Sequence, residues 1–216
     1  MGAIARNIAN NITTSGVFTP DALDSGSVTG ITALANASDG ITLISSQTAS
    51  ASASISFTTG IDATYKAYKF VFSNIHPSND DVLLNVNFST DSGSSYNVTK
   101  TTTFFEVQHD EADTATSLQY NTGADLAQST GDQRIMFSLG TDNDQSCAGT
   151  LTLFNPSSTT YVKHFISTCT VYHNANSASQ AYVAGYANTT SAVNAIIFRA
   201  NAGNIDAGTI YLYGIK

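Results

Sequence analysis

The sequence predicts an all-β protein, an antiparallel β-sandwich or jelly roll of about ten strands preceded by an extended N-terminal arm with a short helix. Two observations lead to this prediction. From Gly40 onward, short runs of β-branched and aromatic residues alternate with polar residues, and clusters of Asn, Asp, Gly, Pro and Ser separate the runs. Helical periodicity is almost absent from the same region. An up-and-down barrel built from the same strands is the alternative.

The composition limits both the size of the fold and the kinds of partner. A chain of 216 residues can bury one sizeable core, so we expect a single β domain over residues 40–216 and an appended arm over residues 1–39. Charged residues make up only 11% of the chain and the net charge is −8, so a nucleic acid is not expected as a partner. No stretch reaches the roughly 18 consecutive apolar residues of a membrane helix, so membrane insertion is not expected either.

The N-terminal arm differs in composition from the rest of the chain. Isoleucines recur at helical spacing between Ala3 and Ile12, which predicts a short amphipathic helix that needs a docking partner to be stable. Residues 13–38 then place isolated apolar side chains among turn formers, as in an extended peptide that anchors in the grooves of another protein. A flexible linker is the alternative. The expected docking residues are Ile4, Ile8, Ile12, Val17, Phe18 and Leu23.

The clearest strands of the β domain lie between Tyr65 and Tyr96. Apolar residues alternate with other residues over 68–72 and again over 84–88, so each strand turns one apolar side toward a core. We expect the two strands to pair as neighbours. Residues 76–81, His-Pro-Ser-Asn-Asp-Asp, favour turns and should form the loop between them.

The other strands follow at short intervals along the chain. The stretch 109–132 is acidic with few apolar residues, and we expect it to be an elaborated surface loop. The closing strand is apolar on both faces, as is required where both faces are covered or where the outer face meets another subunit. The remaining predicted strands are 41–45, 51–58, 101–107, 134–139, 148–154, 161–172, 181–186, 194–199 and 208–213.

Residues suited to catalysis or metal binding are few, and we expect no catalytic residues, no metal site and no cofactor. The four histidines, His76, His109, His164 and His173, lack the spacing of a metal site, and His164 and His173 should point to opposite faces of one strand. Cys147 and Cys169 are too few for a disulfide framework, so they should be buried thiols. The carboxylates near Glu106 cluster along a loop, which does not set the fixed separation that hydrolysis needs.

A surface rich in hydroxyls, amides and tyrosines suits contact with sugars, because aromatic rings stack on them and amides bind their hydroxyl groups. Loops 76–81, 109–132 and 174–180 are the candidates for a distal contact surface. The candidate contact residues are His76, Asp80, Asp81, His109, Tyr120 and His173.

Three segments, 65–96, 149–165 and 187–213, carry motifs that recur together: a Y-x-x-Y-x-F strand, a loop after I-H-P, a D-S-G-S-S-Y turn and a terminal G-T-I-x-L-Y-G-I. On these motifs the chain resembles a group of virion structural proteins from tailed phages of aquatic bacteria such as cyanobacteria. The resemblance extends over nearly the whole chain and includes S-G-V-F-T-P-D-A-L in the arm. It implies a fibre, tail-fibre or head-decoration protein and supplies no catalytic residues.

Taken together, these observations favour a non-enzymatic virion protein that is assembled in the host cytoplasm. We expect a homotrimer whose arm docks on a capsid, portal or tail protein while the β domain projects outward. A carbohydrate-binding module for host recognition, contacting a host-surface glycan, is the second hypothesis. A glycan depolymerase is the third.

Overall fold

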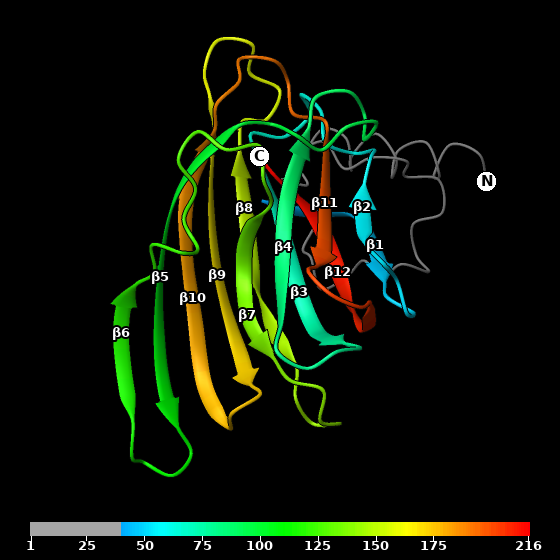
Figure 1. Ribbon diagram of the computed structural model, residues 1–216. Helices are drawn as coiled ribbons and strands as arrows, with labels where there is room; N and C mark the ends of the chain where they lie inside the picture. The colour runs from blue at the N-terminus through cyan, green and yellow to red at the C-terminus, as the bar shows by residue number, and fades with distance from the viewer. Residues whose placement is uncertain (1–39) are drawn as a thin grey trace, which may run out of the picture. The chain divides into compact units, whose positions relative to one another are not determined.

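The computed structural model describes residues 40–216, and the predicted arm with its helix and docking residues lies outside this range (Figure 1). Within the described residues there are only strands and connections, so no helix there is long and apolar enough to cross a membrane. All pairings between the strands are antiparallel, which confirms the all-β antiparallel prediction. The strands are β1 Ile41–Thr48, β2 Ile55–Phe57, β3 Ala67–Pro77, β4 Val82–Ser89, β5 Lys100–Asp110, β6 Thr116–Tyr120, β7 Gln133–Leu139, β8 Cys147–Phe154, β9 Lys163–His173, β10 Ser177–Ala187, β11 Ala195–Ala200 and β12 Ile205–Ile215.

The twelve strands form one nearly barrel-like sheet that consists of two runs. The long run has eight strands in the order β1-β12-β3-β8-β9-β10-β5-β6, and the short run has four in the order β7-β4-β11-β2. A single pair, Leu139 with His173, joins the runs through β7 and β9. In Figure 1 the short run lies in front of the long one.

The hydrophobic core fills the space between the two runs. Along β9, for example, alternate residues from Lys163 to Val171 are buried while those between them are exposed or half-buried, as a strand covered on one face requires. Phe198 of β11 lies at the centre of an aromatic cluster and packs edge-to-face against three rings of the core. These rings belong to Phe57, Phe70 and Phe72.

The predicted pairing of residues 68–72 with 84–88 is wrong. β3 pairs with β12 and β8 in the long run, whereas β4 pairs with β7 and β11 in the short run. The alternation of apolar residues correctly identifies the buried side of each strand, but it carries no information about the partner strand. Both edges of β3 are taken by strands distant in sequence, so the connection after Pro77 crosses from one run to the other.

Three predicted loops also contain strand residues. The predicted loop 174–180 is wrong from Ser177 onward, where β10 begins, and only 174–176 connect it to β9. β5 continues to Asp110, and Thr116–Tyr120 form β6, so the predicted loop 109–132 is wrong over these residues. β6 is an edge strand with its side chains mostly exposed, which explains why its composition is polar and gave no apolar period. β3 likewise continues through His76 to Pro77, and only 78–81 connect it to β4.

The closing strand β12 lies between β1 and β3, inside the long run. Ile210 and Leu212 are fully buried in the core, whereas Tyr211 and Tyr213 are half-buried on the opposite, outer face of the sheet. Both faces of β12 therefore carry apolar side chains, but only the face with Ile210 and Leu212 belongs to the core. Whether another subunit covers the tyrosines stays a prediction.

Candidate functional site

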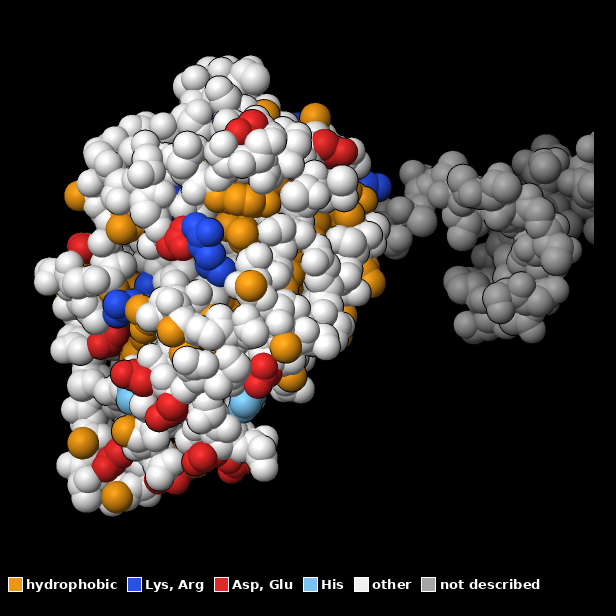
Figure 2. Space-filling view, turned by 45° about the vertical axis from the view of Figure 1, so that its right-hand side comes forward, with side chains coloured by type: hydrophobic (Ala, Val, Ile, Leu, Met, Phe, Trp, Pro, Cys, Tyr) orange, Lys and Arg blue, Asp and Glu red, His pale blue; other side chains and the backbone are white. Residues whose placement is uncertain are grey.

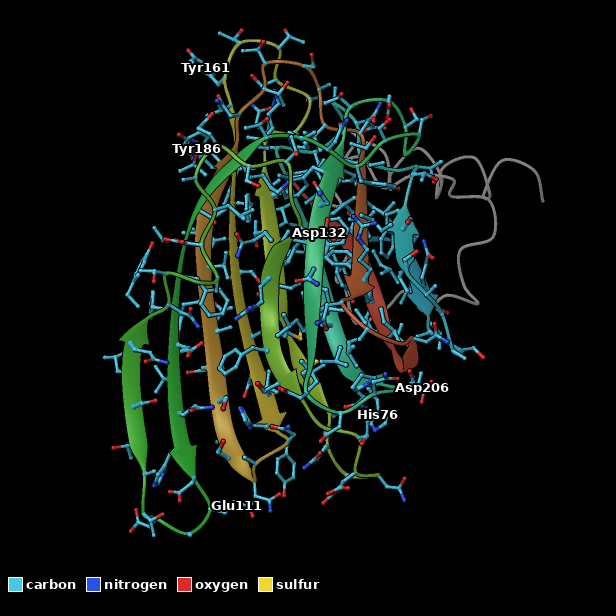
Figure 3. The ribbon with its side chains drawn as sticks, viewed as in Figure 1. His76, Glu111, Asp132, Tyr161, Tyr186 and Asp206 are labelled. Atoms are coloured by element: carbon cyan, nitrogen blue, oxygen red, sulfur yellow. The ribbon has the colours of Figure 1, made fainter. Side chains whose placement is uncertain are left out.

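Six connections meet at one end of the described domain, the lower end in Figure 1, which is called the loop end below. Because successive strands alternate in direction, every second connection reaches this end. The connections are 49–54, 78–81, 111–115, 140–146, 174–176 and 201–204. Figure 3 labels Glu111 in one of them, and it places His76 and Asp206 beside another.

The loop end is strongly acidic. The six connections contain no lysine or arginine, and six of their residues are carboxylic acids. Figure 2 shows the acidic side chains of the visible face gathered mostly toward this end, with Lys and Arg nearer the middle. A partner at this end would therefore meet a negative field. The six acids are Asp80, Asp81, Glu111, Asp113, Asp142 and Asp144.

Five of the six predicted contact residues lie at the loop end. His76 and His109 are the next-to-last residues of β3 and β5, and His173 is the last residue of β9. Asp80 and Asp81 are exposed in the connection between β3 and β4. Tyr120 does not join them. It ends β6 on the side away from the loop end, where it pairs with Phe105.

The histidines of the loop end differ in their surroundings. His173 lies on the inner face against the ring of Phe137, and His164 on the outer face, so the predicted division of β9 between two faces is confirmed. Burial lowers the pKa of His173, although the nearby carboxylates, Asp81 foremost, oppose this effect. His109 is exposed, and its Nε2 lies 3.0 Å from Asp113 Oδ1.

The remaining histidine and the acids around it do not form a metal centre. His76 borders a hollow of 510 Å³ together with Asp144 and Asp206, and its Nε2 is buried with no hydrogen-bond partner among residues 40–216. Within that same range, no group of three His, Cys, Asp or Glu side chains is arranged to hold a metal ion.

A buried polar network that the sequence analysis did not predict links the two runs. Lys100 of β5 is fully buried, and its Nζ donates hydrogen bonds of 2.7 Å to Asn87 Oδ1 and to the Val98 carbonyl. Asn87 in turn donates to Asp132 Oδ1 at 2.8 Å, and Asp132 accepts two hydrogen bonds from Arg199, at 2.5 and 2.6 Å. These residues come from four separate segments of the chain. Nothing in the sequence around each polar residue indicates that the four side chains meet.

The electrostatics of this network follow from its burial. Desolvation lowers the pKa of Lys100 to about 8, although the charge of Asp132 opposes the effect. For Asp132 burial acts to raise the pKa, but the hydrogen bonds from Arg199 and Asn87 outweigh it and the pKa is lowered. Because the Lys100 ammonium donates to two fixed protein acceptors away from solvent, its role is to tie β5 to β4.

Both cysteines are free and buried, as predicted. Desolvation raises the pKa of Cys169 to about 12 and that of Cys147 well above its ordinary value. A thiol becomes a nucleophile as the thiolate, so neither side chain is activated at neutral pH.

The outer face of the long run carries most of the exposed apolar side chains. Eight large hydrophobic residues of the described domain are exposed, and all but Tyr161 lie on this face. Leu118 is the most exposed of all, at 73%. Such residues mark contact surfaces when they gather on one face. The seven are Ile41, Leu43, Phe105, Leu118, Tyr120, Phe154 and Ile166.

The sequence was compared with models of known protein families and with curated proteins, and neither comparison finds a match to this chain.

Proposed function

We propose that the chain is a non-enzymatic virion structural protein of a tailed phage, a homotrimeric fibre or head-decoration component. In this proposal residues 1–39 dock on a capsid, portal or tail protein, and the β domain projects outward and contacts the host surface. The exposed apolar face of the long run carries the proposal, because a surface of this kind on a sheet calls for a partner. The resemblance of three segments to phage virion proteins gives the kind of particle.

We infer that the fold is a jelly-roll β-sandwich to which four strands are added. In a jelly roll, the first, eighth, third and sixth strands form one sheet and the second, seventh, fourth and fifth form the other. With β5, β6, β9 and β10 set aside, the described strands follow this order as β1-β12-β3-β8 and β2-β11-β4-β7. Jelly rolls occur in viral capsid proteins and in lectins, which agrees with the proposal by analogy of fold alone.

Deletion of residues 1–38 separates docking from folding. We expect the remaining chain to be soluble and folded but missing from purified particles, because the docking residues are gone. Circular dichroism would follow folding, and quantitative immunoblotting of particles from a complemented phage would follow incorporation. Normal incorporation of the truncated chain would contradict the docking role. Light scattering of both forms would give the number of copies, three being expected.

A carbohydrate-binding module for receptor recognition is the second candidate. The stacked rings of Phe105 and Tyr182 on the outer face favour it, because exposed aromatic rings bind the apolar faces of sugars. Saturable binding to host polysaccharide would support this function, and release of reducing ends would indicate a depolymerase instead.

A further inference from the structure

Four strands lie outside the eight that follow the jelly-roll order, and they form one continuous extension of the long run. β9 pairs with β8 and continues the sheet through β10 and β5 to the edge strand β6. Eight strands suffice to enclose a core in this topology. The extension therefore enlarges the outer face of the sheet.

The middle of this extension is uncharged on its outer face. β5, β10 and β9 each point five side chains outward, from Thr101 to His109, from Ala178 to Tyr186 and from His164 to Tyr172. None of the fifteen is Asp, Glu, Lys or Arg. Hydroxyl groups and aromatic rings predominate instead, so the surface can bind a neutral polar ligand without desolvating a charge.

The outward side chains of β10 are small at Ala178 and Ala184 and large at Gln180, Tyr182 and Tyr186, and this shapes the surface. Tyr182 stacks on Phe105 with the ring centres 4.6 Å apart and the planes 8° from parallel, and this pair forms a ridge. On one side of the ridge Ala184 forms the floor of a hollow of 480 Å³, with Tyr186 and Ile166 among its lining residues. Figure 3 shows Tyr186 at the upper end of β10.

A second hollow, of 510 Å³, lies on the other side of the ridge around Ala178. His109 and Tyr172 line it, and Glu111 and Asp113 border it at the loop end. Carboxylates accept hydrogen bonds from hydroxyl groups and repel anions. The two alanines are six residues apart on one strand, so the two hollows lie about 20 Å apart at roughly 3.3 Å per residue. The two hollows and the ridge between them are together called the groove along β10.

We propose that this groove along β10, over the outer face of β5, β10 and β9, is a binding site for an uncharged glycan chain. Tyr186 and the ridge formed by Tyr182 and Phe105 contact pyranose rings, the threonine hydroxyls of β5 and β9 bind sugar hydroxyls, and the acidic border excludes anionic polymers. The backbone of β10 pairs with β5 and β9 along its whole length, so an added peptide strand finds no free main-chain groups here. The inference gives the ligand class and the place of the host contact in the proposed function, and it rests on that function.

The test is affinity electrophoresis of the full chain in native gels containing dextran, laminarin or agarose, with alginate as the anionic comparison. We expect retardation by at least one neutral glycan, unchanged between 50 and 500 mM NaCl because no ion pair is involved. Tyr182→Ala and Tyr186→Ala should each weaken retardation about tenfold, the effect expected for the loss of one stacked ring. Tyr213→Ala is the matched control, since it removes a half-buried tyrosine from the same outer face but outside the groove.

The outcomes separate this proposal from the proposed function. No retardation of the wild-type chain by any neutral glycan would overturn the groove, as would an equal loss in Tyr213→Ala or preferential binding to alginate. A change in oligomeric state on Tyr182→Ala, measured by light scattering, would assign the face to a second copy and also overturn it. Incorporation of Tyr182→Ala into particles tests the virion role independently, and we expect it to be normal because the arm is intact.

Discussion

Replacement of Asp132 by Asn tests the buried network directly. Asp132 accepts two hydrogen bonds from Arg199 and one from Asn87, and its charge also acts on Lys100. Asn keeps the shape but removes the negative charge, which leaves two cations without a counterion. A broken buried ion pair costs about 3–5 kcal/mol, and the partial exposure of Asp132 and Arg199 reduces this by screening. We therefore expect the free energy of unfolding to fall by about 2 kcal/mol.

Urea unfolding measures this change in the free energy of unfolding. It is followed by far-ultraviolet circular dichroism, because the chain contains no tryptophan and so cannot be followed by tryptophan fluorescence. Asp206→Asn is the matched control, because Asp206 is an exposed acid at the loop end without a salt bridge in the described domain. This substitution should change the free energy of unfolding by less than about 0.5 kcal/mol. The double variant Asp132→Asn with Arg199→Met should recover part of the loss, because it removes one unpaired cation. A loss below about 0.5 kcal/mol in Asp132→Asn would show that solvent screens the pair and would refute this reasoning.

Three further predictions concern stability. Phe198→Ala removes the ring at the centre of the aromatic cluster and should lower the free energy of unfolding by about 4 kcal/mol. The melting temperature should therefore fall by roughly 10 °C, and a fall of under about 3 °C would contradict the packing described. Gly208→Ala places a Cβ 2.5 Å from the Asn74 carbonyl oxygen at a φ of +105°, so it should lower the urea midpoint, whereas Gly40→Ala, in open space, should not. The pKa of Lys100 is about 8 in the folded state, below its value in the unfolded state, so the unfolded state binds more protons above pH 8. The free energy of unfolding should therefore rise between pH 8 and 9.5 in the wild type but not in Lys100→Met.

Much of the strand content follows from local patterns, as the strand from Tyr161 to Tyr172 illustrates. Its alternation predicts both the strand and the opposite orientations of His164 and His173, which the structure confirms. Alternation depends only on residues two apart, so it identifies faces from a short window. β6 was missed because an exposed edge strand buries too little to need an apolar period.

Contacts between distant segments could not be predicted in the same way. The partner of β3 depends on β12, more than a hundred residues further along the chain, and the partner of Lys100 depends on how β4 and β5 are brought together. The groove along β10 has the same origin. Phe105 and Tyr182 are ordinary outward residues of two strands, and only the register that pairs them makes a stacked ridge.

The position of the charged groups distinguishes the loop end of the domain from the outer face of β5, β10 and β9. The charge of Lys100 is buried and that of Asp132 is half-buried, and each has fixed hydrogen-bond partners in the fold. The acids of the loop end are instead free of basic neighbours in their own connections, so they repel anionic surfaces and one another. An uncharged face between these regions is where a ligand can approach at the lowest electrostatic cost. Contact through the face of β5, β10 and β9, which includes His109, is therefore favoured over contact through the aspartates of the loop end.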